Sequence, residues 1–361
     1  MGFVRKFKKI TLRIIATANI LVVAVLCATG YAGHINPTAH PSCEVLSLAF
    51  PIPLLLNLGF LLFWLVFHYR YVWIPIAGFL LCAPAVRAYC PFNFGKNAPA
   101  DGLKVMSLNA HIFNYINEGN DLPNPTVDYV CNSGADIVCL QEAAIRRNKE
   151  QLKAQLKAKY PYNENEKDKK REYISVYSKY PIIRHEMVNL IGQRNLCGAF
   201  YIKMGNDTLL VVNCHLEGTR LSDEERDEFG QFVRRKTDKI HKRSIFQKLS
   251  AMGPMHARQA QGILDYITQQ KVKYVVLCGD FNDSPLSYAH HLLTKHLTDC
   301  YTATGCGPGF THRAHGMLVR IDNIMCSPNL EPFDCKIDSK ANISDHNPIS
   351  CTLKKRQKSK K

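Results

Sequence analysis

The first 100 residues of the chain contain almost no acidic side chains. Glu44 stands alone there beside eight basic residues. Runs such as LLLNLGFLLFWLVF also lack the polar face of a soluble amphipathic helix. Three apolar stretches, at about 11–31, 45–67 and 71–90, each approach the roughly 20 residues that a helix needs to cross the hydrocarbon core. We therefore expect about three transmembrane helices.

A cleaved signal peptide accounts for only the first of these stretches, because a leader is not followed by two more spans. Five basic residues precede or enter the first stretch, and Arg70 lies in the short connection HYRYVW. The connection AGHINPTAHPSCE carries no lysine or arginine. Since basic residues favour the cytoplasmic side, we expect a cell-membrane protein whose amino terminus is cytoplasmic and whose carboxyl-terminal domain is extracytoplasmic.

The cysteines include no Cys-x-x-Cys pair, which argues against a structural zinc site. Several lie within apolar runs such as DIVCL and VVLCGD, where cysteine behaves as a small hydrophobic residue. If the domain is exported, Cys300 and Cys306 are the best candidates for a disulfide. Cysteine usage alone leaves the compartment open.

Acidic residues are also outnumbered in the rest of the chain, to a smaller degree. The total charge is +16, and subtracting the +7 of the first 100 residues leaves about +9. Such a surface attracts polyanions or anionic lipid head groups. Solvated helix faces and a frayed basic tail explain the same charges equally well.

After residue 102, short apolar strands alternate with fewer helical patterns. Helices are expected near 124–133, 145–159 and 256–270, where the apolar period is 3.6 residues. A charged insertion at 219–250 is expected to be helical. This order predicts two packed sheets flanked by helices. The expected division of the chain is 1–95 membrane region, 96–102 linker, 103–354 catalytic domain and 355–361 basic tail.

Polar residues stand at the carboxyl ends of many of the predicted strands, where open α/β folds keep their sites. In an extended segment alternate residues share a face, so Asp280 and Asn282 are expected to point the same way. The set consists of Asn109 in MSLNAH, Glu142 in VCLQEA, Asn213 and His215 in VVNCHLEG, Asp280 and Asn282 in CGDFNDSP, Asp322 in VRIDNIM, and Asp345 and His346 in ISDHNP.

Each of these positions has a structural alternative. Glu142 could cap a helix that starts near 145, Asp345 could cap a turn before Pro348, and Asn213 could only brace the site. Asp280 and Asn282 could simply end a strand, because Asp and Asn favour turns. It is their ordered recurrence over the domain that argues for a shared site.

The motifs SLN, LQE, NCHL, GDFND, RIDNI and SDHNP, together with YSKYPI, resemble those of the endonuclease/exonuclease/phosphatase superfamily. The resemblance covers about residues 102–354 and leaves the membrane region outside. It implies a four-layer α/β sandwich, in which two packed mixed sheets are flanked by helices. It also implies a metal-dependent phosphoesterase site at one edge of the sheets.

The resemblance implies a role for each residue type. Glu142 and Asp345, with Asn109, would bind Mg²⁺, with Mn²⁺ as the alternative ion. Asp280 would orient or deprotonate the attacking water, and Asn282 would donate to a phosphoryl oxygen. Asp322 would hold the tautomer of His346, and His215 would donate to a phosphoryl or leaving oxygen. Which histidine acts as the base is left open.

Two positions depart from the family pattern. Asn323 stands in RIDNI where relatives often carry an aromatic residue or histidine, and His111 stands where some nucleases place an acidic ligand. These departures concern the substrate side or a second metal ion.

The leading hypothesis is a membrane-anchored, Mg²⁺-dependent phosphoesterase, with nuclease or phosphodiesterase activity ranked first. A sphingomyelinase-like lipid phosphodiesterase is the alternative within the same class. The expected partners are thus a phosphate-ester substrate, either nucleic acid or a phospholipid head group, and a membrane. A catalytically silent, membrane-tethered binding module of the same fold is the rival from another class.

Overall fold

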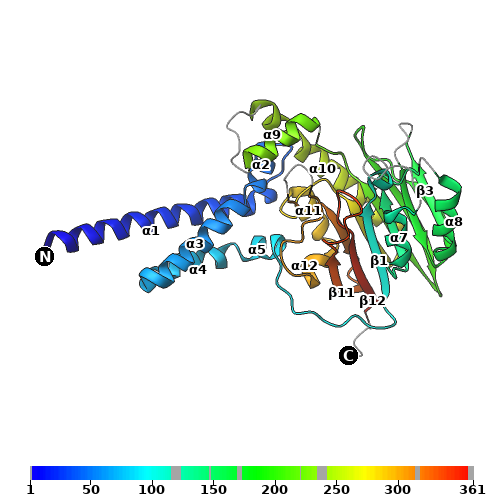
Figure 1. The fold of residues 1–361 in the computed structure, drawn as a ribbon, viewed down its shortest axis with the longest axis horizontal. Helices are drawn as coiled ribbons and strands as arrows, with labels where there is room; N and C mark the ends of the chain where they lie inside the picture. The colour runs from blue at the N-terminus through cyan, green and yellow to red at the C-terminus, as the bar shows by residue number, and fades with distance from the viewer. Residues whose placement is uncertain are drawn as a thin grey trace.

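The computed structural model describes residues 2–114, 123–145, 148–168, 173–219, 221–233, 242–313 and 318–356. Helices of the amino-terminal part project from one side of a body built of two sheets and their covering helices (Figure 1). The basic tail expected at 355–361 lies mostly outside the described residues.

The projecting part contains one straight helix and two bent pairs. Only α1, among the described residues, is by itself long and apolar enough to cross a membrane. The other two candidates qualify only as pairs, bent by 43° and 67°. Prolines lie in the first turn of α3 and of α5, at Pro51, Pro53 and Pro84, and a proline does not continue the hydrogen bonding of a preceding helix. The expectation of three spans therefore reduces to one clear candidate. The elements are α1 (Gly2–Tyr31), η1 (Ala32–His34), α2 (Ser42–Leu48), α3 (Pro51–Phe67), η2 (Tyr69–Tyr71), α4 (Trp73–Leu81) and α5 (Ala83–Tyr89).

Buried amide groups join α1, α3 and α4. The indole Nε1 of Trp64 donates to Asn19 Oδ1 at 3.0 Å, and Asn57 Nδ2 donates to the carbonyl oxygen of Pro75 at 3.0 Å. Asn19 Nδ2 also donates to Asn57 Oδ1 at 3.4 Å. Side-chain hydrogen bonds of this kind hold helices together where water is excluded.

The base of the helical part packs directly on the sheet-containing body. α2 contacts α10, and η1 contacts α11. Gly33 fits so closely that an added Cβ would overlap the backbone oxygen of Leu286. Asn93 Nδ2 also donates to the carbonyl oxygens of Thr302 and Gly305, at 3.1 and 2.8 Å. The helices are therefore docked on this body as well as being linked to it by the chain.

Two six-stranded mixed sheets form the body, in the orders β11-β12-β1-β2-β4-β3 and β5-β6-β7-β8-β10-β9. In each sheet one central pair is parallel, β1 with β2 and β7 with β8. The strands are β1 (Leu103–Asn109), β2 (Ile137–Gln141), β3 (Tyr162–Lys167), β4 (Tyr173–Ser178), β5 (Ile182–Met187), β6 (Leu196–Met204), β7 (Asp207–His215), β8 (Tyr274–Asp280), β9 (Thr298–Asp299), β10 (Asp322–Cys326), β11 (Leu330–Ile337) and β12 (Ile349–Lys355).

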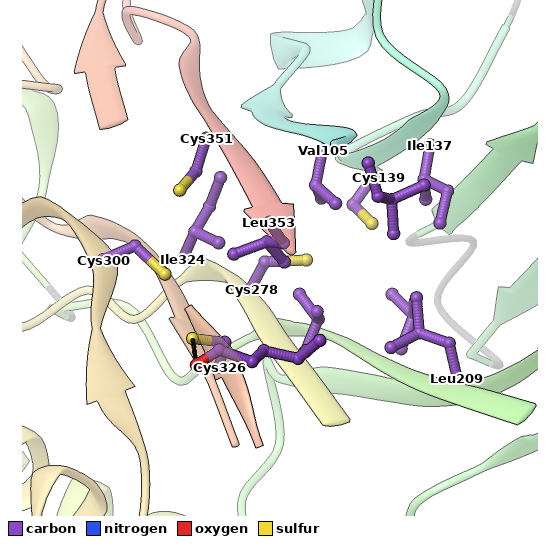
Figure 2. Packing of buried hydrophobic residues seen from close by; sticks show 14 of the residues in the cluster. Val105, Ile137, Cys139, Leu209, Cys278, Cys300, Ile324, Cys326, Cys351 and Leu353 are labelled. Atoms are coloured by element: carbon purple, nitrogen blue, oxygen red, sulfur yellow. Dashed lines mark hydrogen bonds between the residues drawn. The ribbon is translucent and has the colours of Figure 1, made fainter. Parts of the chain in front are cut away.

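Four layers result, as predicted from the sequence. Val105 and Ile137 of one sheet share a buried cluster with Leu209 and Ile324 of the other (Figure 2). Full burial of each such aliphatic side chain contributes roughly 1.5–3 kcal/mol. The outer faces are covered by α7 and α8 on one sheet and by α10 and α11 on the other.

The predicted helices of the body lie where the sequence patterns place them, with different bounds, whereas the helices Tyr288–Thr294 and Cys300–Thr304 were not predicted. The pattern near 256–270 continues a helix that begins at Lys242, with Pro254 inside it. The described part of the charged insertion contains α9 and the start of α10. The helices are η3 (His111–Asn114), α7 (Pro125–Asn132), α8 (Lys149–Lys159), α9 (Asp223–Val233), α10 (Lys242–Gln270), α11 (Tyr288–Thr294) and α12 (Cys300–Thr304).

The cysteines of the body are mostly core residues. Cys139, Cys278, Cys300 and Cys326 are fully buried between the sheets (Figure 2). Cys300 and Cys306, the candidates for a disulfide in an exported domain, are both free thiols here, and Cys306 is exposed. Burial raises the pKa of the Cys300 thiol well above its usual value. Cysteine therefore serves here as a small apolar side chain.

A substitution at Gly279 tests how closely the backbones of β7 and β8 approach each other. Its φ is +137°, and an added Cβ would overlap the backbone oxygen of Cys214. We expect Gly279→Ala to lower the free energy of unfolding by about 3 kcal/mol or more, because steric overlap adds to backbone strain. Urea unfolding of the detergent-solubilised chain measures the change.

Gly205 provides the control for this substitution. Its φ is +65° and no atom lies within 4 Å of an added Cβ, so Gly205→Ala reports strain alone, about 1–2 kcal/mol. Equal losses in the two variants would show that the close approach to Cys214 carries no energetic weight.

Candidate active site

The parallel pairs bring the predicted residues to one edge of the two sheets. Asn109 ends β1 in register with Gln141, the residue before Glu142. In the second sheet His215 ends β7 in register with Asp280 at the end of β8. Asp280 is also paired with Asp322, the first residue of the antiparallel strand β10. Residues far apart in the chain therefore meet because strand ends coincide.

The side-chain amide of Asn109 lies at the centre of this group. Its Nδ2 donates to Glu142 Oε1 and to Asp280 Oδ2, each at 3.1 Å, and thereby joins the two sheets. Its Oδ1 accepts from the backbone N–H of His111 at 3.0 Å. Its carbonyl oxygen accepts from Ser344 Oγ at 2.8 Å, which ties the SDHNP loop to the same strand end.

His215 faces both of these carboxylates. Its Nε2 lies 3.9 Å from Glu142 Oε1 and 3.8 Å from Asp280 Oδ2. Glu142 does not cap the following helix, because α8 begins only after Asn148. Its carboxylate instead belongs to the group around Asn109.

Asp280 and Asn282 are linked to each other by the turn after β8. The backbone N–H of Asn282 donates to Asp280 Oδ1 at 2.8 Å, and its Nδ2 donates to the carbonyl oxygen of Leu216 at 3.0 Å. Nδ2 carries two hydrogens and can also donate to a ligand. Asp280 is buried, with its side chain only 2% exposed.

His346 and Asp322 form the closest acid–base pair of the site. His346 Nδ1 lies 2.8 Å from Asp322 Oδ2, and its Nε2 lies 3.8 Å from Asp280 Oδ2. Burial lowers the pKa of His346, but the charges of Asp322 and Asp280 outweigh burial and raise this pKa to about 10. The imidazole is therefore cationic at neutral pH in the absence of a bound ion.

Asp345 lies between two further imidazoles. His111 Nδ1 is 3.4 Å from its Oδ1, and His312 Nε2 is 3.9 Å from its Oδ2. Burial raises the pKa of Asp345, and the charges of His346, His111 and His312 together lower it below its usual value. The carboxylate is thus ionised.

His312 is a residue of the site that the sequence patterns missed. It lies in GPGFTH, where no apolar strand precedes it, so the pattern of polar strand ends did not select it. Its ring centroid lies 4.7 Å from that of His346. Burial, followed by the charge of His346, lowers its pKa to about 4, so this imidazole is neutral at pH 7.

Asn213 braces the sheets beneath the site. Its Oδ1 accepts from Gln141 Nε2 at 2.6 Å, and its Nδ2 donates to the carbonyl oxygens of Leu140 and Ser175 at 3.1 and 3.2 Å. Every one of these partners lies in the other sheet. Of the two interpretations considered for Asn213, the structure supports the bracing role.

Three residues of the site have left-handed backbone conformations that are uncommon outside glycine. The φ angles are +43° for His111, +46° for Glu142 and +50° for Asn282. Such conformations cost of order 1–3 kcal/mol and concentrate at functional sites. The turns that follow the strands therefore hold these side chains in place at an energetic cost.

The donor set suits a divalent cation. Glu142, Asp280 and Asp345 bring three carboxylates to one edge, and within the described ranges none of them pairs with lysine or arginine. Glu142 and Asp345 are 30% and 32% exposed, so their oxygens are accessible to an ion. Asp322 Oδ1 is buried without a hydrogen-bond partner. Among the described residues, two closely spaced groups of three could hold a metal, His312–Asp345–His346 and Asp280–Asp322–His346, and Glu142 belongs to neither.

Comparison with known proteins gives the same class of fold. Residues 93–346 match the family described as the endonuclease/exonuclease/phosphatase family, and residues 12–89 match a domain of unknown function (DUF8431). No curated protein sequence matches significantly.

Solved structures with a similar fold have low sequence identity to this chain. Truncated Caenorhabditis elegans TDP2 is 17% identical with a TM-score of 0.50, covering 71% of this chain and 99% of its own. The catalytic domain of human nocturnin is 13% identical with a TM-score of 0.52, covering 72% and 97%. An endonuclease/exonuclease/phosphatase from Beutenbergia cavernae is 16% identical with a TM-score of 0.51, covering 70% and 72%.

The bracing role of Asn213 predicts a specific loss of stability. Asn213→Ala removes three buried hydrogen bonds, to Gln141 Nε2, Leu140 O and Ser175 O, so we expect the free energy of unfolding to fall by about 3 kcal/mol. Asn195→Ala is the matched control, because this partly exposed amide donates to Ile191 O at 3.0 Å and costs about 1 kcal/mol or less. Urea titration compares the two, and equal changes would argue against the brace.

Proposed function

The chain belongs to the endonuclease/exonuclease/phosphatase family, and from this premise we propose that it is a membrane-anchored phosphodiesterase or nuclease that uses Mg²⁺, or alternatively Mn²⁺. The strongest support is the arrangement around the side-chain amide of Asn109. This amide donates to both Glu142 and Asp280, and His215 lies near Asp280. Hydrolysis of a phosphate ester requires a water nucleophile, stabilisation of negative charge and protonation of the leaving oxygen.

Glu142 and Asp345, beside Asn109, would hold the ion. When bound, the ion would neutralise charge on the phosphoryl oxygens. Asp280 is placed to orient the attacking water and to accept its proton, since its Oδ2 faces His215 and His346 within the buried edge. Asn282 and His215 would donate hydrogen bonds to phosphoryl oxygens.

His346 is better suited to act as an acid or a positive charge than as a base. Asp322 accepts from its Nδ1 and favours the imidazolium form. The imidazolium of His346, whose Nε2 lies 3.8 Å from Asp280 Oδ2, would stabilise the negative charge that develops on the phosphoryl group during in-line attack. This interpretation assigns the acceptance of the water proton to Asp280.

The helical region supports membrane anchoring. Large apolar side chains point outward from α3, including Leu55, Leu65, Val66 and Phe67, each more than half exposed. Such a surface fits lipid better than water. The amino terminus and the α3–α4 connection lie at the end far from the sheets (Figure 1). Their basic residues would place that end in the cytoplasm and the catalytic domain outside.

Two substrate classes fit this arrangement. The excess of basic over acidic residues after residue 100 favours nucleic acid, which ranks first. A phospholipid head group is the second candidate, because the catalytic body is docked on the base of the candidate membrane helices through Gly33 and Asn93. Comparing DNA, RNA and sphingomyelin under identical conditions separates the two.

Hydrolysis of bis-p-nitrophenyl phosphate tests the proposed reaction. The full-length chain in detergent should be active with Mg²⁺ or Mn²⁺ and inactive in EDTA. We expect Asp280→Asn to lower kcat by about 100-fold or more, because the proton acceptor is lost without a change of shape. Asp136→Asn is the control, since Asp136 precedes β2 at the opposite end of the strand from Gln141. Equal rates with ion, with EDTA and in the Asp280 variant would favour the silent binding module.

Accessibility of the carboxyl end tests the proposed topology. A single cysteine placed after residue 356 in a chain with its exposed cysteines replaced should react with a membrane-impermeant maleimide in intact cells. We expect this labelling because an odd number of spans would place the carboxyl end on the opposite side of the membrane from the cytoplasmic amino terminus. Labelling only after the cells are permeabilised would contradict the extracytoplasmic placement.

A further inference from the structure

His312, which has no role in the proposed reaction, completes a compact group of metal-binding side chains with Asp345 and His346. Its Nε2 lies 3.9 Å from Asp345 Oδ2, and its ring centroid lies 4.7 Å from that of His346. One donor atom from each of the three residues lies within 4.8 Å of the others. Both imidazoles are buried, and Asp345 is partly exposed. An ion could therefore enter from the solvent side.

Backbone hydrogen bonds hold the segment that carries His312, and a neighbouring carboxylate fixes the orientation of the His346 imidazole. His312 N donates to Val319 O at 3.0 Å, and Val319 N donates to His312 O at 3.2 Å. His346 Nδ1 is bound to Asp322, which leaves Nε2 directed into the site. Histidine ligands of metals usually donate their other ring N–H to a carboxylate in this way. The Asp322–His346 pair thus has the arrangement of a ligand with its supporting acid.

The donor chemistry differs from that of the Mg²⁺ ligands. Glu142 and Asn109 offer oxygen atoms, which suit Mg²⁺. Two imidazole nitrogens with one carboxylate suit Zn²⁺, Co²⁺ or Mn²⁺. We propose that His312, Asp345 and His346 form a second divalent-ion site that prefers nitrogen-binding metals such as Zn²⁺ and Co²⁺. The proposal deepens the proposed function, because it shares Asp345 and His346 with the catalytic set.

Occupation of this site would oppose catalysis. Asp345 belongs to both proposed sites, so an ion held by His312, Asp345 and His346 would compete with Mg²⁺ for this carboxylate. Zn²⁺ should therefore inhibit hydrolysis that Mg²⁺ supports. In His312→Gln, the Zn²⁺ concentration that halves the variant's own Mg²⁺-supported rate should rise about tenfold or more.

Direct binding gives a readout that does not depend on activity. The full-length chain in detergent is stripped with EDTA and titrated with Co²⁺ while the visible absorption of the bound ion is recorded. We expect His312→Gln to weaken Co²⁺ binding about tenfold or more, with little change in its thermal midpoint. Unchanged affinity in a folded His312→Gln variant overturns the proposal.

A surface histidine supplies the matched control. His185 is exposed, with its Nε2 3.3 Å from Glu164 Oε2 and its Nδ1 2.8 Å from Glu166 Oε1. These three side chains are thus an alternative place for a metal ion to bind. His185→Gln should leave the Co²⁺ affinity unchanged. Loss of binding in this variant, with none in His312→Gln, would assign the ion to the surface and overturn the proposal.

Isotope labelling of the unmutated chain makes the test independent of variant folding. Pulsed electron paramagnetic resonance of bound Co²⁺ should show coupling to histidine nitrogen that changes on ¹⁵N-histidine labelling. Absence of that coupling overturns the second site even if Mg²⁺ supports hydrolysis. Nitrogen coupling in a chain that hydrolyses no phosphodiester supports the site and contradicts the proposed function instead.

Discussion

The amide of Asn109 is the interaction on which the site depends. It donates at 3.1 Å to Glu142 from its own sheet and to Asp280 from the facing sheet. Two carboxylates at one buried edge repel each other unless hydrogen bonds or a cation compensate them. Asn109 supplies the hydrogen bonds, and the uncompensated remainder of the charge is what makes the edge receptive to a divalent ion.

The sheets make this meeting possible because each has a parallel pair at its centre. Carboxyl ends of parallel strands lie side by side, so Asn109 lies beside the residue before Glu142, and His215 lies beside Asp280. Asn213 and Gln141 then lock one sheet to the other below the site. The mixed topology is thus the structural cause of the chemistry, and the left-handed turns at Glu142 and Asn282 aim the side chains.

The sequence was sufficient to predict the four layers and the grouping of the polar strand ends, because alternation and ordered motifs report burial and register. The pairing of Asp322 with His346 was implied by the family resemblance, and the two side chains do form a hydrogen bond. His312 was missed because a histidine in a glycine- and proline-containing loop has no periodic signal. The sequence also offered no means of telling that Cys300 is buried and Cys306 exposed. The bends before α3 and α5 were missed although Pro51 and Pro84 mark them in the sequence.

The central claim is that these separated side chains bind one divalent ion at the edge between the sheets. Anomalous diffraction from crystals of the chain soaked in Mn²⁺ measures this most directly. The account predicts a peak within coordinating distance of Glu142 and Asp345, at roughly 2–2.5 Å from their oxygens. A well-ordered edge with no peak there, or with an ion bound only elsewhere on the molecule, would contradict it.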